Sequence, residues 1–188
     1  MERCQWVGND ELMQNYHDHE WGVPVHKDQL LFEFITLEGA QAGLSWKTIL
    51  KKREYYRTAF DNFEPEKVAA YSLTKIETLL RNHNLIRNRR KIESVISNAQ
   101  AIIEIQKQHG SFSNYIWSFT QGKTIQNSWQ SHVEIPQHTI ESRNMSNGFK
   151  KKGFKFVGQT ICYSFMQAVG MVNDHTINCF KHDLHLNK

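Results

Sequence analysis

The sequence predicts an all-α protein, and two observations carry this prediction. Only three prolines occur in 188 residues, and no stretch of strand length alternates convincingly between apolar and polar residues. Several stretches instead repeat apolar residues at helical spacing. The clearest is 87–108, whose apolar face includes Ile92 and Ala99. We therefore expect one compact helical domain over 1–188, a length that can bury a real core.

Each expected helix carries a residue type that favours its start or its end. Side chains of Ser, Thr and Asp accept hydrogen bonds from the free N–H groups of a first turn, and Gly tolerates the conformation that ends a helix. In chain order, we expect a helix from Asp28 to about Ala42, one from Ser45 to about Phe60, one at the Thr74-x-x-Glu77 capping box, one over 87–108 ended by Gly110, a polar surface connection over 120–140, a helix from Ser142 to Gly153 and one from Gln159 to Ala168.

The basic residues are concentrated in three clusters. The net charge of +4 and the isoelectric point near 8.9 are mild, so the distribution matters more than the sum. Solvated helix faces often carry such clusters, but three of them in a short chain favour a polyanionic partner. The clusters are Arg87, Arg89, Arg90 and Lys91; Lys47, Lys51, Lys52 and Arg53; and Lys150, Lys151, Lys152 and Lys155.

Cysteine usage and the lengths of the apolar runs predict a cytoplasmic protein. Three cysteines cannot form a disulfide framework, and an odd number fits a reducing compartment. Residues 1–6 lack the apolar segment of a secretory signal, and no apolar run approaches the roughly 20 residues that span a bilayer. We expect a monomer with no membrane association.

Four potential metal ligands stand near the two ends of the sequence. Cys4 and His17 are near the start, and His175 and Cys179 form an H-x3-C motif near the end. Because residues i and i+4 share one helix face, we expect this motif to lie on a helix and to point two ligands at one ion. A Cys2His2 set fills all four tetrahedral positions, which favours a structural zinc. The alternative is a chance coincidence of two buried cysteines and two histidines.

The segment from Gly153 to Thr160 lies between two expected helices and follows three consecutive lysines. A short turn that ends at Gly158 before a helix leaves backbone N–H groups free to face an anion. With Lys152 and Lys155 beside the turn, that anion is interpreted as a nucleic-acid phosphate. An ordinary helix–helix turn would give the same pattern, and the residues alone leave the two interpretations open.

Glu38 stands at an unfavourable position for a carboxylate. It falls on the apolar stripe that Phe34 and Ile35 mark, near the C-terminus of its expected helix. Burial opposes ionisation of the side chain, and the helix macrodipole repels an anion there. A residue placed against its local preference indicates a functional role. An exposed Glu at a fraying helix end is the alternative.

Several short motifs are specific enough to compare with known families. They are Tyr16-His17-Asp18, Glu20-Trp21-Gly22, Leu37-Glu38-Gly39, Gln41-Ala42-Gly43-Leu44-Ser45-Trp46, Lys151 to Gly158, and Cys162 to Ala168. Together they resemble the bacterial 3-methyladenine DNA glycosylase I family, a branch of the helix-hairpin-helix DNA glycosylase superfamily. The resemblance runs from Cys4 to about Cys179 and is weakest over 120–145. It implies that the four metal ligands bind zinc and that 142–170 forms the helix-hairpin-helix element.

The resemblance also implies roles for the residues of a base-binding pocket. Glu38 hydrogen-bonds a base that has been flipped out of the duplex, and the rings of Tyr16 and Trp46 flank that base. Trp6 closes the pocket, although large aromatic residues are often simply part of the core. Leu44 either probes the gap left in the duplex or serves as a helix staple. The residues expected to contact DNA are Leu44, Gly43, Lys152, Lys155, Phe156, Gly158 and Thr160.

Two positions depart from what many superfamily members carry. Asn173 stands where many relatives have a catalytic Asp, and Thr160 stands where strand-cutting relatives place a Lys. Methylation at N3 puts a positive charge on adenine, so the base leaves as a neutral species and needs little general-acid help. We therefore expect a monofunctional glycosylase in which Glu38 supplies recognition and part of the electrostatics.

The sequence thus predicts a glycosylase that removes 3-methyladenine from alkylated double-stranded DNA, releasing the free base and leaving an abasic site. Structural zinc would join residues 1–25 to residues 170–180. One rival is a nucleic-acid-binding module with a structural metal and no chemistry, but such a module gains nothing from Glu38 near a phosphate backbone. Another is a zinc hydrolase, which would need an open coordination position.

Overall fold

The structure, a computed structural model, describes residues 1–183 and is predominantly helical, which confirms the predicted fold class. None of the helices in this range is long and apolar enough to cross a membrane. In chain order the helices and strands are α1 (Glu11–His19), α2 (Asp28–Gln41), α3 (Trp46–Ala59), α4 (Pro65–Ala69), α5 (Leu73–Arg81), α6 (Arg89–His109), α7 (Phe112–Trp117), β1 (Ile125–Gln126), α8 (Ile140–Lys151), α9 (Gln159–Ala168) and β2 (Val172–Asn173).

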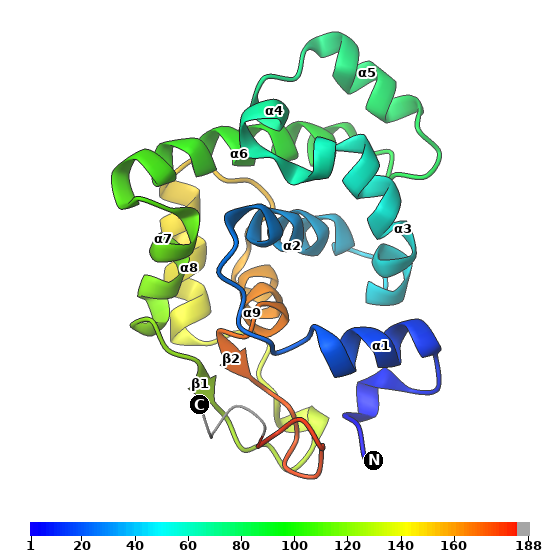
Figure 1. Ribbon diagram of the computed structural model, residues 1–188, viewed down its shortest axis with the longest axis vertical. Coiled ribbons are helices and arrows are strands. Elements are labelled where there is room, and N and C mark those ends of the chain that lie inside the picture. Colours follow the sequence, from blue (N-terminus) through cyan, green and yellow to red (C-terminus); the bar gives the residue numbers. More distant parts are fainter. Residues whose placement is uncertain (184–188) are drawn as a thin grey trace.

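Helix α2 is the central element of the fold (Figure 1). It packs against α3, α6, α7 and α9, which lie on different sides of it. Every residue from Leu31 to Ala40 is therefore buried, including Glu38. The apolar stripe predicted around Phe34 understates this burial, because α2 is covered all round like a core helix rather than along one face.

Most of the predicted helix boundaries are confirmed to within two residues. The Ser45 side chain caps α3 by accepting from the Thr48 backbone N–H at 3.2 Å. Gly110 ends α6 with a φ of 82°, in the left-handed region that favours glycine. Helix α9 has the predicted bounds, whereas α8 begins two residues earlier than Ser142, because Thr139 is its N-cap.

Two predicted caps are wrong. Asp28 is the first residue of α2 and does not cap it. Its carboxylate instead accepts from the backbone N–H groups of Phe112 and Ser113, each at 2.8 Å, and so caps α7. Ser72, rather than Thr74, caps α5. Both errors arise because a short polar side chain near a helix start fits several cap positions, and tertiary packing selects among them.

The polar connection over 120–140 lies largely at the surface, as predicted, but it also contains β1. This strand pairs in parallel with β2, with Ile125 opposite Val172. The pairing holds the connection beside the segment that follows α9 (Figure 1). Helices α1, α4 and α7 are further elements that the sequence pattern did not predict.

The two ends of the described chain are joined to each other. The backbone N–H of Phe180 donates to the Glu2 carbonyl at 3.0 Å. The loop that follows β2 thereby closes against the N-terminal segment.

Candidate active site and metal site

Side chains from α1, α2, α3 and α9 line an open cavity of about 150 Å³. Tyr16, Glu38 and Trp46 meet here, together with Trp6 from the 3-10 turn Gln5–Val7. The structure thus brings together four residues that the sequence keeps apart, although their roles in binding stay predictions. A cavity of roughly 150 Å³ can hold one aromatic ring. The other lining residues are Trp21, Gln41, His132, Ile135, Ser164 and Gln167.

Glu38 supplies a buried carboxyl to this cavity. The residue is 4% exposed, and burial raises the pKa of its side chain to about 8. Within residues 1–183 the carboxyl makes no hydrogen bond and no ion pair. A buried carboxyl without a partner is costly, and a positive charge beside it would favour the ionised form. The alternative of an exposed Glu at a fraying helix end is therefore wrong.

Aromatic rings form the walls of the cavity. The Tyr16 and Trp46 rings lie 5.4 Å apart between centroids, and Trp6 meets Trp21 edge to face at 5.0 Å. The Nε1 groups of Trp6 and Trp46 are buried and have no hydrogen-bond partner in the described residues. Burial, and then the nearby Glu38, raise the pKa of Tyr16, so its hydroxyl stays protonated. Flat walls with spare donors and one spare acceptor suit a flat heteroaromatic ring.

A second hollow, of about 210 Å³, opens beside the first. Both are lined by Glu38, Gln41 and Ser164, so they meet around the carboxyl. The second hollow is also lined by Leu44, which is 39% exposed, and by Thr160 at the start of α9. The predicted DNA-contact residues Leu44 and Thr160 therefore flank one route from the surface to Glu38.

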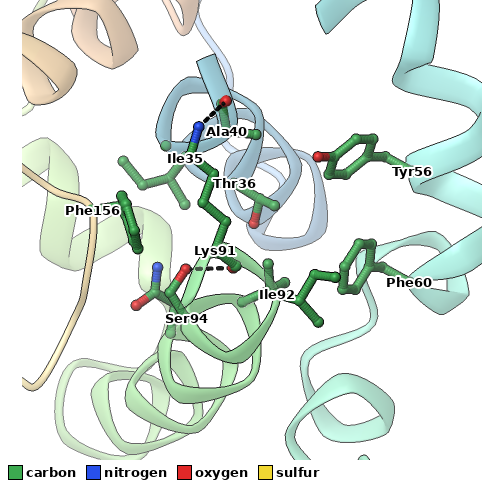
Figure 2. A pocket seen from close by; sticks show the side chains of 12 residues that line it. Ile35, Thr36, Ala40, Tyr56, Phe60, Lys91, Ile92, Ser94 and Phe156 are labelled. Atoms are coloured by element: carbon green, nitrogen blue, oxygen red, sulfur yellow. Dashed lines mark hydrogen bonds between the residues drawn. The ribbon is translucent and has the colours of Figure 1, made fainter. Parts of the chain in front are cut away.

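Lys91 holds the C-terminal end of α2 from the neighbouring helix α6. Figure 2 shows its side chain reaching across to α2, past Ile35 and Thr36. The Nζ group donates to the carbonyl of Ala40 at 2.8 Å and to that of Ala42 at 3.0 Å. Burial lowers the pKa of this lysine. Because the last carbonyls of a helix lack intrahelical donors, Lys91 caps the helix that carries Glu38 and fixes the start of the loop to Leu44.

The three basic clusters differ in how far their charges are already paired. Arg53 is buried and bonded to Glu33, and Arg89 pairs with Glu77. Lys91 donates hydrogen bonds to carbonyls at the end of α2. The charges of Arg53 and Arg89 are therefore paired within the fold, whereas Lys91 keeps its charge and binds backbone carbonyls. The lysines of the third cluster that are exposed and free of ion pairs within residues 1–183 are Lys150, Lys151 and Lys155.

The third cluster borders the turn between α8 and α9, which pack against each other. Asn98 on α6 clamps this turn by accepting from the Lys155 backbone N–H at 2.8 Å and donating to the Lys155 carbonyl at 3.1 Å. Lys155 itself remains exposed, whereas Lys152 donates to Gln108. Gly158 precedes α9 without any side-chain cap, so the first amides of the helix are left for another acceptor.

The same turn contacts α2 directly. Phe156 has a φ of 54°, which is unusual for a residue with a side chain. A Cβ added at Gly39 would lie 3.3 Å from the Phe156 Cβ and 3.4 Å from its carbonyl oxygen. Glycine at position 39 therefore lets the turn approach α2 closely, one residue from Glu38.

The four predicted metal ligands form a single buried cluster. Cys179 Sγ lies 3.4 Å from both His17 Nε2 and His175 Nδ1, and Cys4 Sγ lies 3.6 Å from His175 Nδ1. A tetrahedral zinc with sulfur at about 2.3 Å and nitrogen at about 2.0 Å separates such ligand atoms by about 3.5 Å. The donor set and its spacing therefore fit a tetrahedral metal ion.

Hydrogen bonds behind the cluster orient the two imidazoles for this role. His17 Nδ1 lies 2.8 Å from the Asp18 carboxylate, and His175 Nε2 lies 3.2 Å from the Trp21 carbonyl. Both partners are acceptors, so the opposite ring nitrogens keep a free lone pair for a metal. Arg3 holds Asp18 in turn and lowers the pKa of its carboxyl to about 2, against the opposing effect of burial.

The thiols also fit a bound cation. The neighbouring Cys179, together with burial, raises the pKa of Cys4 well above its usual range. Two thiolates side by side repel each other, and a cation between them removes that penalty.

The helix predicted for the H-x3-C motif is wrong. His175 and Cys179 lie in an irregular segment after β2, where the Cys179 N–H donates to the Thr176 carbonyl at 2.8 Å. A turn therefore brings the two ligands together. Gly22 makes room for this arrangement, because its φ is 78° and a Cβ there would lie 3.0 Å from His175 Nε2.

Asn173 lies next to this cluster and does not line the cavity. It is fully buried, and its Nδ2 donates to Gln126 Oε1 and to the His182 carbonyl, each at 2.9 Å. Its Oδ1 accepts from the His175 N–H at 3.2 Å. The amide thus orders the chain that leads into the metal cluster.

Sequence reasoning missed several residues of the cavity wall. Gln41, Ser164 and Gln167 have no distinctive spacing, and His132 and Ile135 come from a connection predicted to be only surface. Each lies on a segment that folding alone brings to Glu38. Gln41, Ser164 and Gln167 fall within the motifs that resemble the glycosylase family, and this resemblance was the available signal.

The fold and the site define a class of protein, namely a helical protein with an aromatic pocket around a buried carboxyl and a lysine-bearing turn nearby. The profile of the methyladenine glycosylase family matches residues 6–182. The chain therefore belongs to the methyladenine glycosylase family, as its motifs predicted.

Known relatives agree over nearly the whole chain. DNA-3-methyladenine glycosylase 1 of Escherichia coli (strain K12) is 49% identical over 179 residues, which are 95% of this chain and 96% of that protein. A crystal structure of 3-methyladenine DNA glycosylase I is 50% identical, with a TM-score of 0.94 over 96% of this chain and 100% of the other. The Staphylococcus aureus enzyme, solved to explain 3-methyladenine recognition, is 36% identical, with a TM-score of 0.93 and 97% of each chain covered.

Proposed function

We propose that this protein is a monofunctional DNA glycosylase that hydrolyses the N-glycosidic bond of 3-methyladenine in alkylated double-stranded DNA. The products are the free base and an intact strand with an abasic site. Family membership supports the enzyme class. The observation that carries the proposal is Glu38, a buried carboxyl without a partner in an aromatic cavity.

The charge of the lesion explains why this cavity suffices for recognition. N3-methylated adenine is a cation, and ionised Glu38, a buried side chain, attracts it. Normal bases carry no such charge, so they cannot offset the cost of ionising a carboxyl with a pKa of about 8. The rings of Tyr16 and Trp46 stack on the extruded base, and Trp6 closes the pocket.

DNA contact is assigned to a helix-hairpin-helix over 142–170. The free amides at the start of α9, from Gly158 to Thr160, face a backbone phosphate, and exposed Lys155 adds charge to the contact. Leu44, exposed at the edge of the second hollow, fills the gap left by the flipped nucleotide.

The metal cluster is proposed to hold a structural zinc through Cys4, His17, His175 and Cys179. With four protein ligands the ion has no open position, so it supplies no chemistry and stabilises the joined chain ends. The side chains that line the two hollows include no lysine, and Thr160 offers no amine, which supports hydrolysis without strand cleavage. The enzyme is proposed to act as a monomer.

One assay tests this function. The purified protein is incubated with a methylated duplex, and released bases are separated and identified. We expect 3-methyladenine, with strand breaks appearing only after alkali treatment of the abasic sites. DNA binding without any base release would contradict the proposal and favour a binding module.

A further inference from the structure

Asp174 is a buried acidic residue that the proposed reaction does not use. It is 1% exposed, and its carboxylate accepts four hydrogen bonds. Asn127 Nδ2 and Trp129 Nε1 donate to Oδ1 at 2.6 and 2.8 Å. The Tyr163 hydroxyl and Gln167 Nε2 donate to Oδ2 at 2.6 and 2.7 Å. The carboxylate is therefore a rigid acceptor that all four neighbours must face with an N–H or O–H.

This arrangement fixes the orientation of the Gln167 side-chain amide. Because a carboxylate offers only acceptors, the amide nitrogen faces Asp174, and Oε1 is turned the other way. Gln167 also lines the aromatic cavity, and within residues 1–183 its Oε1 accepts no hydrogen bond. The cavity thus contains a neutral acceptor whose direction is set from behind.

Glu38 and Gln167 would act by different means. Glu38 acts through its charge, and because burial raises its pKa to about 8, near neutral pH the carboxyl of the free protein can be protonated and can then donate as well as accept. Gln167 Oε1 can only accept, at any pH, while Asp174 holds the amide nitrogen.

We propose that Gln167 is a specificity residue whose Oε1, oriented by Asp174, accepts an N–H of the exocyclic amino group of the bound purine. A 6-amino purine satisfies this acceptor, whereas a 6-oxo purine places a carbonyl oxygen against it. Sites built to hydrogen-bond a particular group strongly reject analogues that leave the buried partner unpaired. The inference rests on the proposed function and names what the same cavity selects.

The test compares two lesions of equal charge and methyl position. Duplexes carry either N3-methyladenine or N3-methylguanine at one site, and kcat/KM for base release is measured for each. Gln167→Met keeps the size of the side chain and removes the acceptor. We expect the ratio of 3-methyladenine to 3-methylguanine release to fall at least about tenfold. Gln100→Met, the same change at an exposed position on α6, should leave the ratio unchanged.

Asp174→Asn keeps Gln167 but lets its amide turn over, so the ratio should fall in the same direction. An unchanged ratio in folded Gln167→Met protein overturns the proposal. If neither variant folds, the wild-type protein is titrated with free 3-methyladenine while the Gln167 side-chain carbonyl is followed by ¹³C NMR. A shift on saturation supports the contact, and no shift overturns it. Failure of the proposed function would give a different result, namely no base release by the wild-type protein. The NMR titration measures binding of the free base and does not depend on catalysis.

Discussion

Replacing Glu38 by Gln should stabilise the protein and disable it at the same time. Burial raises the pKa of this carboxyl from 4.5 to about 8. Between these values the unfolded chain releases the proton while the folded protein keeps it, so wild-type stability falls as pH rises. Full ionisation costs at most about 5 kcal/mol, since each pH unit in the window contributes about 1.4 kcal/mol. Gln has no proton to lose and escapes this dependence.

The contribution of Glu38 ionisation to stability can be isolated by comparing the wild-type protein with Glu38→Gln. Other titrating groups affect both equally, so their difference in unfolding free energy reports Glu38 alone. From pH 6 to pH 9 that difference should grow by about 2.5 kcal/mol in favour of Glu38→Gln. Urea unfolding at pH 6, 7, 8 and 9 measures it. Parallel stability profiles for the two proteins would refute the assignment of a raised pKa to this carboxyl.

The same pKa predicts the pH dependence of base release. If the ionised carboxylate receives the cationic base, kcat/KM for 3-methyladenine release should rise about tenfold between pH 7 and pH 9 and then level off. Glu38→Gln should retain zinc, fold and non-specific DNA affinity, yet lose most base release at every pH. Release at the wild-type rate by this variant would show that the recognition carboxylate lies elsewhere.

Four further predictions follow from the site. Freshly purified protein should contain one zinc per chain by metal analysis, and Cys179→Ser should lower the unfolding free energy by several kcal/mol; protein without zinc would contradict this. Lys155→Ala should reduce the slope of log Kd against log salt by about one, as measured by fluorescence anisotropy, and Lys152→Ala should have a smaller effect because that side chain already bonds Gln108. Equal loss in both variants would show that the Gln108 contact opens on binding. Lys91→Met should slow base release, because the end of α2 loses its cap, while Lys91→Arg should keep part of the rate. Single-turnover kinetics measure these rates, and a wild-type rate in Lys91→Met would show that the cap has no role in base release. With Thr160 in place of an amine, borohydride should trap no enzyme–DNA adduct. With Asn173 in place of an Asp, release should depend on the charge of the lesion, so uncharged hypoxanthine should be released poorly; efficient release would reveal a further catalytic group.

Some of the site could be predicted from the sequence because its signals are local. A carboxylate on the apolar face of a helix, as at Glu38, conflicts with its neighbours in a way that spacing reveals. The Cys and His residues at the chain ends were recognisable by type, but their geometry was not. The H-x3-C pattern suits a helix, yet His175 and Cys179 meet in a turn that β1–β2 pairing and the N-terminal segment support.

Other parts of the site could not be predicted because they exist only in the folded chain. Gln167 is an ordinary helix residue until Asp174 orients it, and Asp174 needs donors from the connection over 120–140. Lys91 belonged to a basic cluster by sequence, and only the crossing of α6 over α2 commits it to the carbonyls of Ala40 and Ala42. In each case a distant partner decides the role of the side chain.

The close approach of Phe156 to Gly39 fixes the distance between the turn that precedes α9 and the Glu38 carboxyl. The proposed phosphate-binding turn and the helix that carries Glu38 touch through the Phe156 Cβ and carbonyl, with no side chain at position 39 to flex between them. In the proposed complex, the distance from the bound phosphate to the carboxyl is therefore set mainly by backbone. We expect a nucleotide to reach Glu38 only if it leaves the duplex at the right number of steps from that phosphate. Even one methyl group at position 39 would push the turn away from α2 by a few tenths of an ångström and so lengthen this distance.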